Sequence, residues 1–137
     1  MRKTTIPFAA DDPSAAVAAI DPRGWVNLRP DLDDVPPPSR GWVGNVFSNR
    51  GPAVPMATWH PGDRAAGIEH GTGSKLGGGV LVPAGWRVVQ DHPRRGLVVR
   101  VPDDVEDAEV VRWLVELGEQ LSPLPTAGRW TAVVFSP

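Results

Sequence analysis

The clearest hydrophobic pattern in the chain lies near its C-terminal end. Between Val110 and Leu121 an apolar residue recurs at every third or fourth position, which is the spacing of one helix face. Five acidic residues lie just before or at the start of this run, where the helix dipole favours negative charge. Asp103 followed by Glu106 is also typical of a capping box. The pattern predicts a helix over about 104–121.

Two β-branched runs precede this helix. Residues 86–90 (WRVVQ) and 97–101 (LVVRV) are separated by six residues that include Pro93 and Gly96. Short runs of this kind, joined by a turn sequence, indicate an antiparallel hairpin. A further apolar run at 130–135 (WTAVVF) predicts a strand that follows the helix.

The N-terminal half has weaker signals. Residues 12–20 predict a short helix, because Asp12 can cap it and alanines favour it. Three strands are predicted, at 25–28, 42–47 and 53–59. Pro55 would place the last of these at a sheet edge or a bulge. Ten of the sixteen prolines fall in the first 61 residues, so residues 1–60 are interpreted as a proline-rich, partly irregular wrap.

Together these elements predict a single α+β domain over residues 1–137. Its core would be an antiparallel or mixed sheet of short strands. The long helix at about 104–121 and the short N-terminal helix would pack on one face of that sheet. The predicted strands do not alternate regularly with helices, which disfavours a doubly wound nucleotide-binding fold.

Composition narrows the functional classes. The chain has no cysteine, so disulfides, thiol catalysis and cysteine-based zinc sites are excluded. The formal net charge is −2 and neither half of the chain is strongly basic, which argues against nucleic-acid binding. The sequence shows neither a membrane span nor a signal peptide. We therefore expect a cytoplasmic protein that binds neither nucleic acid nor membrane.

The glycine-rich segment 69–79 is the first candidate site. Gly73 is followed by Ser74 and then Lys75, the reverse of the order in a phosphate-binding P-loop. Leu76 stands where a dinucleotide-binding fingerprint needs a glycine. The backbone amides of Gly71 to Gly73, together with Lys75, could still form a small anion nest. A simple connection between two strands is the alternative, and no cofactor is predicted.

The hairpin tip 91–96 is the second candidate site, because it presents two arginines beside a histidine. Guanidinium groups suit the bidentate binding of carboxylate or phosphate. A ligand site that joins the tip to the glycine-rich segment would use Glu69, His70, Gly71, Gly73, Ser74, Lys75, His92, Arg94 and Arg95. A charged tip that only keeps the hairpin in solution is the structural alternative.

No metal site and no catalytic residue are predicted. An alternative set of metal ligands would be His60, Asp63, His70 and His92. Their spacing matches no diagnostic motif such as H-E-x-x-H, and two of the three histidines precede proline, which suits turn positions. A nucleophilic serine is equally unsupported, because no G-x-S-x-G motif occurs.

The segments IEHGTG, AGWRVVQDHPRRGLVV and GRW, read together, resemble a family of small actinobacterial proteins with no assigned activity. The resemblance covers about the last two-thirds of the chain. It implies a bacterial cytoplasmic origin and implies no catalytic residue.

Two functions agree with these observations. The favoured hypothesis is a non-enzymatic domain that binds another protein or a second copy of itself. Catalytic motifs are missing, whereas tryptophan and arginine, which are typical interface anchors, are abundant. The alternative is a domain, enzymatic or not, that binds a small molecule or an anion with the segment 69–79 and the tip 91–96.

Overall fold

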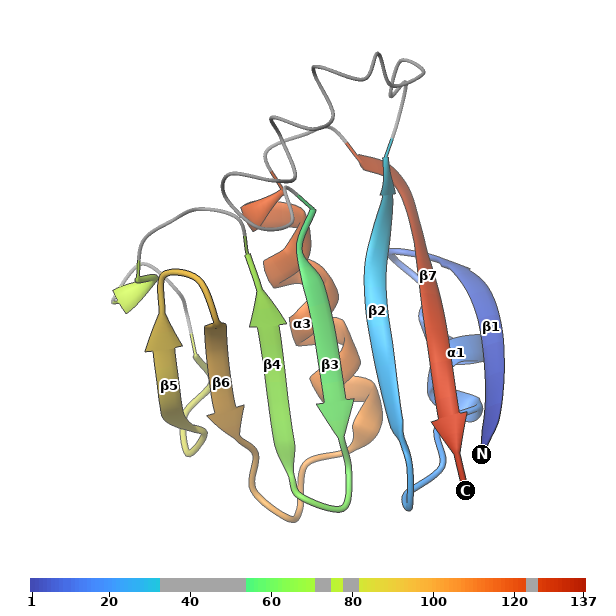
Figure 1. The fold of residues 1–137 in the computed structure, drawn as a ribbon, viewed down its shortest axis with the longest axis horizontal. Coiled ribbons are helices and arrows are strands. Elements are labelled where there is room, and N and C mark those ends of the chain that lie inside the picture. Colours follow the sequence, from blue (N-terminus) through green and yellow to red (C-terminus); the bar gives the residue numbers. More distant parts are fainter. Residues whose placement is uncertain (33–53, 71–74, 78–81, 123–125) are drawn as a thin grey trace.

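The fold is built around one antiparallel sheet (Figure 1). The computed structural model describes residues 1–32, 54–70, 75–77, 82–122 and 126–137. Seven strands pair in the order β1-β7-β2-β3-β4-β6-β5, and all neighbours are antiparallel. The strands are β1 (Arg2–Ala9), β2 (Trp25–Leu32), β3 (Met56–His60), β4 (Ala65–Glu69), β5 (Arg87–His92), β6 (Gly96–Arg100) and β7 (Thr126–Ser136). The helices within the described ranges are α1 (Ser14–Ala18) and α3 (Asp107–Leu121).

The predicted fold class is wrong, because the molecule is mainly β rather than α+β. Among the residues that the structure describes, a seven-stranded antiparallel sheet dominates, beside one helix of 15 residues and one of five. The prediction missed two strands. β1 is mostly exposed and contains Pro7, so it shows little apolar alternation. β4 has the sequence AAGIE, whose alanines and glycine have weak strand propensity. The last strand, predicted at 130–135, extends over 11 residues.

Both helices lie on the same side of the sheet. In Figure 1, α3 passes behind β3 and α1 lies behind β7. Six residues of α3 are buried, and they join the inward-facing residues of the strands in one core. The largest fully buried side chains of that core are Trp59 and Trp130. Gly118 of α3 lies against the second of these, since a Cβ built there would be 2.3 Å from the Trp130 ring.

The start of α3 differs from the prediction. The helix begins at Asp107 instead of 104, and Glu106 occupies the N-cap position without a side-chain hydrogen bond, so the predicted capping box is not formed. The Asp107 carboxylate instead accepts a hydrogen bond of 2.8 Å from the indole N–H of Trp59. At the other end of the helix, Glu119 accepts one of 2.8 Å from the indole of Trp130. Carboxylates of α3 therefore satisfy both buried indoles.

Three local predictions in the N-terminal half also need correction. α1 is shorter than the predicted 12–20, and Asp12 bonds the hydroxyl of Ser14 at 2.7 Å instead of occupying the N-cap. β3 lies inside the sheet, between β2 and β4, and Pro55 lies just before its first residue, so no edge or bulge is needed. The strand predicted at 42–47 lies outside the described residues.

The predicted antiparallel pairing of the two β-branched runs is confirmed by β5 and β6. The turn is shorter than the expected six residues, because β5 continues to His92 and β6 begins at Gly96. Gly96 adopts a φ of 91°, and a Cβ there would be 2.2 Å from the Ile68 carbonyl oxygen. Glycine is thus required at position 96, where the start of β6 lies close against the backbone of Ile68 in β4.

Neither helix in the part of the chain that the structure describes is long and apolar enough to cross a bilayer.

Candidate functional site

One face of the sheet carries both helices, and no element among the described residues covers the other, which we call the open face. Alternate residues of a strand point to opposite faces, so the register places the open-face residues in rows across the strands. The aromatic row consists of Lys3, Phe135, Trp25 and His60. The floor row consists of Thr5, Val133, Asn27, Thr58, Gly67 and Val98. The third row includes Arg29, Met56 and Glu69.

The aromatic row forms a continuous stack. Phe135 and Trp25 have ring centroids 4.7 Å apart, and Trp25 and His60 have centroids 5.7 Å apart. Their planes are within 15° and 23° of parallel. The ammonium of Lys3 lies 6.0 Å from the centroid of the Phe135 ring. Each ring therefore stacks on its neighbour. The ring edges face outward beside the floor row.

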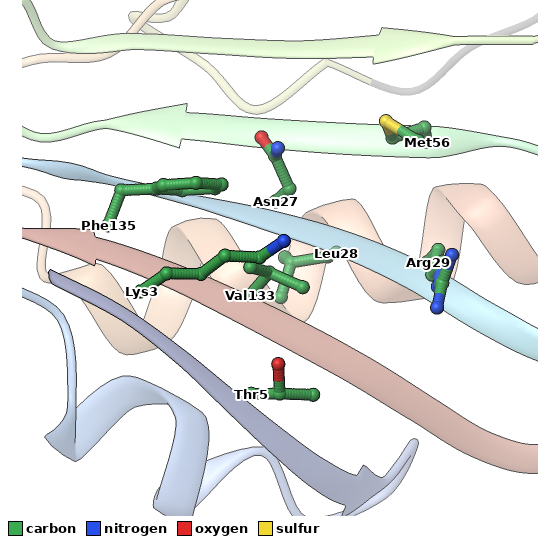
Figure 2. A pocket seen from close by; sticks show the side chains of 8 residues that line it. All are labelled: Lys3, Thr5, Asn27, Leu28, Arg29, Met56, Val133 and Phe135. Carbon is green, nitrogen blue, oxygen red and sulfur yellow. The ribbon is translucent and has the colours of Figure 1, made fainter.

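Two hollows lie along the floor row. The first, of about 240 Å³, lies over Thr5, Val133 and Asn27 (Figure 2). The second, also of about 240 Å³, lies over Thr58, Gly67 and Val98.

The two hollows share Met56 as a lining residue. A hydrogen bond of 3.0 Å from the Thr58 hydroxyl to the Asn27 side chain joins their floors. We call the combined depression the trough, which runs across the strands from β1 to β6.

Charge differs between the two hollows. Lys3 and Arg29 line the first hollow, and no acidic side chain is among the described residues that line it. Figure 2 shows the side chains of these two cations well apart, with Lys3 on β1 and Arg29 on β2. The second hollow is lined by Glu69 as well as Arg95. The trough is thus cationic at one end and mixed at the other.

The whole open face is more basic than the chain as a whole. By register, Arg87 and Arg100 stand opposite each other on this face, at the end of the β5–β6 pair. Neither they nor the cations of the first hollow form an ion pair with an acid among the described residues. Of the acids in the described strands, the register places Asp31 and Glu69 on this face, whereas five exposed acids lie before and along α3, at 103, 104, 106, 109 and 116. A net charge of −2 therefore conceals a separation of charge between the two sides.

The two sequence-predicted candidate segments do approach each other, through Asp91. Its carboxylate accepts hydrogen bonds from the backbone amides of Leu76, at 2.9 Å, and Gly77, at 2.8 Å. These bonds, with the nearby charges of Lys75 and His70, hold the pKa of Asp91 below its ordinary value. The protein's own carboxylate thus binds the amides of Leu76 and Gly77, whereas Gly71 to Gly73, where the anion nest is predicted, lie outside the described residues.

The remaining predicted site residues do not act together in one site. His70 is buried at the end of β4, and burial lowers its pKa despite the charge of Asp91. His92 accepts hydrogen bonds on Nδ1 from the amides of Arg94, at 3.0 Å, and Arg95, at 3.1 Å, so it closes the hairpin turn. Glu69, Lys75 and both arginines are exposed, whereas Gly71, Gly73 and Ser74 lie outside the described residues.

The alternative metal site is not assembled. His60 and His70 lie at opposite ends of β3 and β4, because His60 pairs with Ala65 and His70 follows the last residue of β4. Among the described residues, no three His, Asp or Glu side chains are grouped closely enough to hold a metal ion.

No protein-family model, curated protein or solved structure matches this chain. The resemblance to small actinobacterial proteins therefore adds nothing to the site.

Sequence reasoning missed the trough, because its residues come from six strands. Lys3 and Trp25 belong to no sequence motif, so no local pattern marks them as site residues. The available signal was the alternation in β2 and β3, where polar Asn27 and Thr58 each stand between two apolar residues.

Proposed function

We propose that the protein is a non-enzymatic cytoplasmic domain that acts by binding another protein through the open face of its sheet. The observation that supports this most is the aromatic row. Three stacked rings remain partly exposed on a face that no described element covers. Aromatic residues and arginine are enriched at the centres of protein interfaces, and this face combines both.

The ring geometry favours protein over nucleic acid as the partner. Proteins that bind single-stranded nucleic acid offer ring faces on which bases stack. Here Phe135, Trp25 and His60 stack on one another, and Lys3 lies over the outer face of the first ring. The stack leaves ring edges, which suit contact with aliphatic and carboxylate groups of a protein chain.

The alternative, a small-molecule or anion site at 69–79 and 91–96, has weaker support. Asp91 already accepts the amides of Leu76 and Gly77. His92 is engaged in closing its own turn. These contacts favour structural roles for both segments.

Selection from a displayed random peptide library on the immobilised protein would test the proposal. Enriched peptides would then be titrated against the wild type, a Lys3→Glu/Arg29→Glu double variant and Arg112→Glu as the control. Arg112 is exposed on α3, so its reversal changes the net charge without touching the open face.

We expect the wild type and the control to bind alike and the double variant to bind at least about tenfold more weakly, since it reverses two interface charges. Absence of any enriched peptide, or equal loss in the control, would contradict the proposal.

A further inference from the structure

We infer that the trough receives an extended acidic segment of the partner protein, with an acidic side chain held between Lys3 and Arg29. This inference rests on the proposed function, because it names the chemistry of what the open face would bind. Its support comes from the dimensions of the trough, the position of its charges and the polar groups on its floor.

The dimensions of the trough fit an extended chain better than a helix. The floor row crosses from β1 to β6, which is five strand spacings and therefore about 24 Å. An extended chain covers that length with about seven residues. The walls rise from Trp25 and Arg29 of β2, whose backbone positions are about 13 Å apart. Side chains narrow this gap further, so a helix of about 10–12 Å diameter does not enter it.

The charges determine which end of the trough takes the acidic side chain. Lys3 and Arg29 face the first hollow, and no described acid lines it, so a carboxylate there would meet two cations. The second hollow holds Glu69 as well as Arg95, so it suits a neutral or mixed part of the segment. Since opposite charges on rim positions steer association and fix orientation, the segment would lie in one direction.

The floor supplies hydrogen-bonding groups but no free strand edge. Thr5, Asn27 and Thr58 present hydroxyl and amide groups at three places along the trough, with Val133 between the first two. An extended segment lying across the strands can use these groups for its own backbone. Gly67, the next floor residue, has no side chain and keeps the second hollow open.

A second copy of this chain is a poorer occupant. In a two-fold dimer built on the open face, each surface meets its own equivalent. The Arg87–Arg100 pair and the two trough cations would then approach like charges, and the described open-face acids Asp31 and Glu69 are fewer than these four cations. The same cations favour an acidic chain.

The test is an NMR titration of isotope-labelled protein with a seven-residue peptide of glutamate, serine and glycine, carrying three central glutamates. Its matched control peptide has glutamine in place of each glutamate. We expect amide shifts at Asn27, Thr58 and Gly67, none along α3, and binding by the control peptide at least about tenfold weaker.

Variants locate the acidic side chain. Lys3→Glu and Arg29→Glu should each weaken binding several-fold, and the double variant should instead bind a peptide with three central lysines. Glu69→Lys, at the mixed end of the trough, should change the affinity for the glutamate peptide less than either of these variants. Gly67→Ala adds a methyl group to the floor, and the Cβ would meet neighbours only at 3.4 Å, so the fold should survive while binding weakens.

The outcomes separate this inference from the proposed function. If library peptides bind the open face but the glutamate peptide binds no better than its glutamine control, the inference is wrong and the proposed function stands. If neither binds the open face, both fail. Stronger binding of a single-stranded oligonucleotide, or shifts caused by self-association, would overturn the acidic segment as the occupant.

Discussion

The two faces of this sheet are made by alternate residues of the same strands, yet they differ in how their large side chains are satisfied. On the covered face, Trp59 and Trp130 are fully buried and donate to carboxylates of α3. On the open face, Trp25 and Phe135 stack on each other and remain partly exposed. The covered face is stabilised by contacts with α3. The open face leaves the edges of its rings available for binding.

Polar groups follow the same division. Those of the covered face are bonded to α3 across the core, whereas those of the open face bond laterally between strands. Thr58 donates to Asn27 at 3.0 Å, and Thr131 donates to Asp31 at 2.9 Å. Lateral bonds leave the surface above them uncovered, so we expect substitutions on the covered face to change stability and those on the open face to change binding.

The largest difference is expected for a matched pair of truncations. Leu114 of α3 is fully buried, and Leu114→Ala should lower the free energy of unfolding by about 2–5 kcal/mol. Val133, on the floor of the trough, is partly exposed, and Val133→Ala should lower it by about 1 kcal/mol or less. Urea unfolding of both variants measures the difference. Similar losses would mean that the open face is covered in solution.

A smaller effect is expected at the contact between α3 and the sheet. In Gly118→Ala, the higher helix propensity of alanine should by itself stabilise α3 by about 1 kcal/mol. However, the new Cβ would approach the Trp130 ring to 2.3 Å, and overpacking a core typically costs about 1–3 kcal/mol. We expect a net loss of stability in thermal melts, with the exposed Gln120→Ala as the control. A gain would show that the covered face is loosely packed.

The elements of the covered face were only partly predictable from the sequence. The apolar repeat that ends at Leu121 and the two β-branched runs have strong local patterns, and they correspond to α3 and the β5–β6 pair. β1 and β4 were missed because the first is an exposed edge strand with a proline and the second owes its place to its neighbours. Local propensity does not report burial that distant strands create.

The open face could not be predicted from the sequence. Lys3 lies beside Phe135 only because the first and last strands pair, and their residues are at opposite ends of the chain. The glycine-rich segment drew attention by composition, yet its described residues Leu76 and Gly77 bind the protein's own Asp91. A binding face assembled by register leaves no contiguous motif.

The pH dependence of stability should come from a buried histidine. His70 is buried at the end of β4, and burial holds its pKa below the ordinary 6.5. As the pH falls through 6.5, the unfolded chain binds a proton that the folded protein does not, so the free energy of unfolding decreases. The difference between wild type and His70→Gln, measured by urea unfolding from pH 8 to pH 5, should show this decrease. An unchanged slope in the variant would assign the dependence elsewhere.

The smallest expected effect concerns the hydrogen bond between Asn27 and Thr58 on the floor of the trough. Water competes for both groups on an uncovered face, so a cross-strand pair of this kind should contribute only about 0.2–1 kcal/mol. A double-mutant cycle compares the free energies of unfolding of the wild type, Asn27→Ala, Thr58→Ala and the double variant. It isolates this coupling from the effect of each truncation alone. Repeating the cycle with the glutamate peptide bound removes much of that competition, and the coupling should then increase. A coupling above about 1.5 kcal/mol in the protein alone would indicate that the floor is already shielded from water, which would contradict an open face.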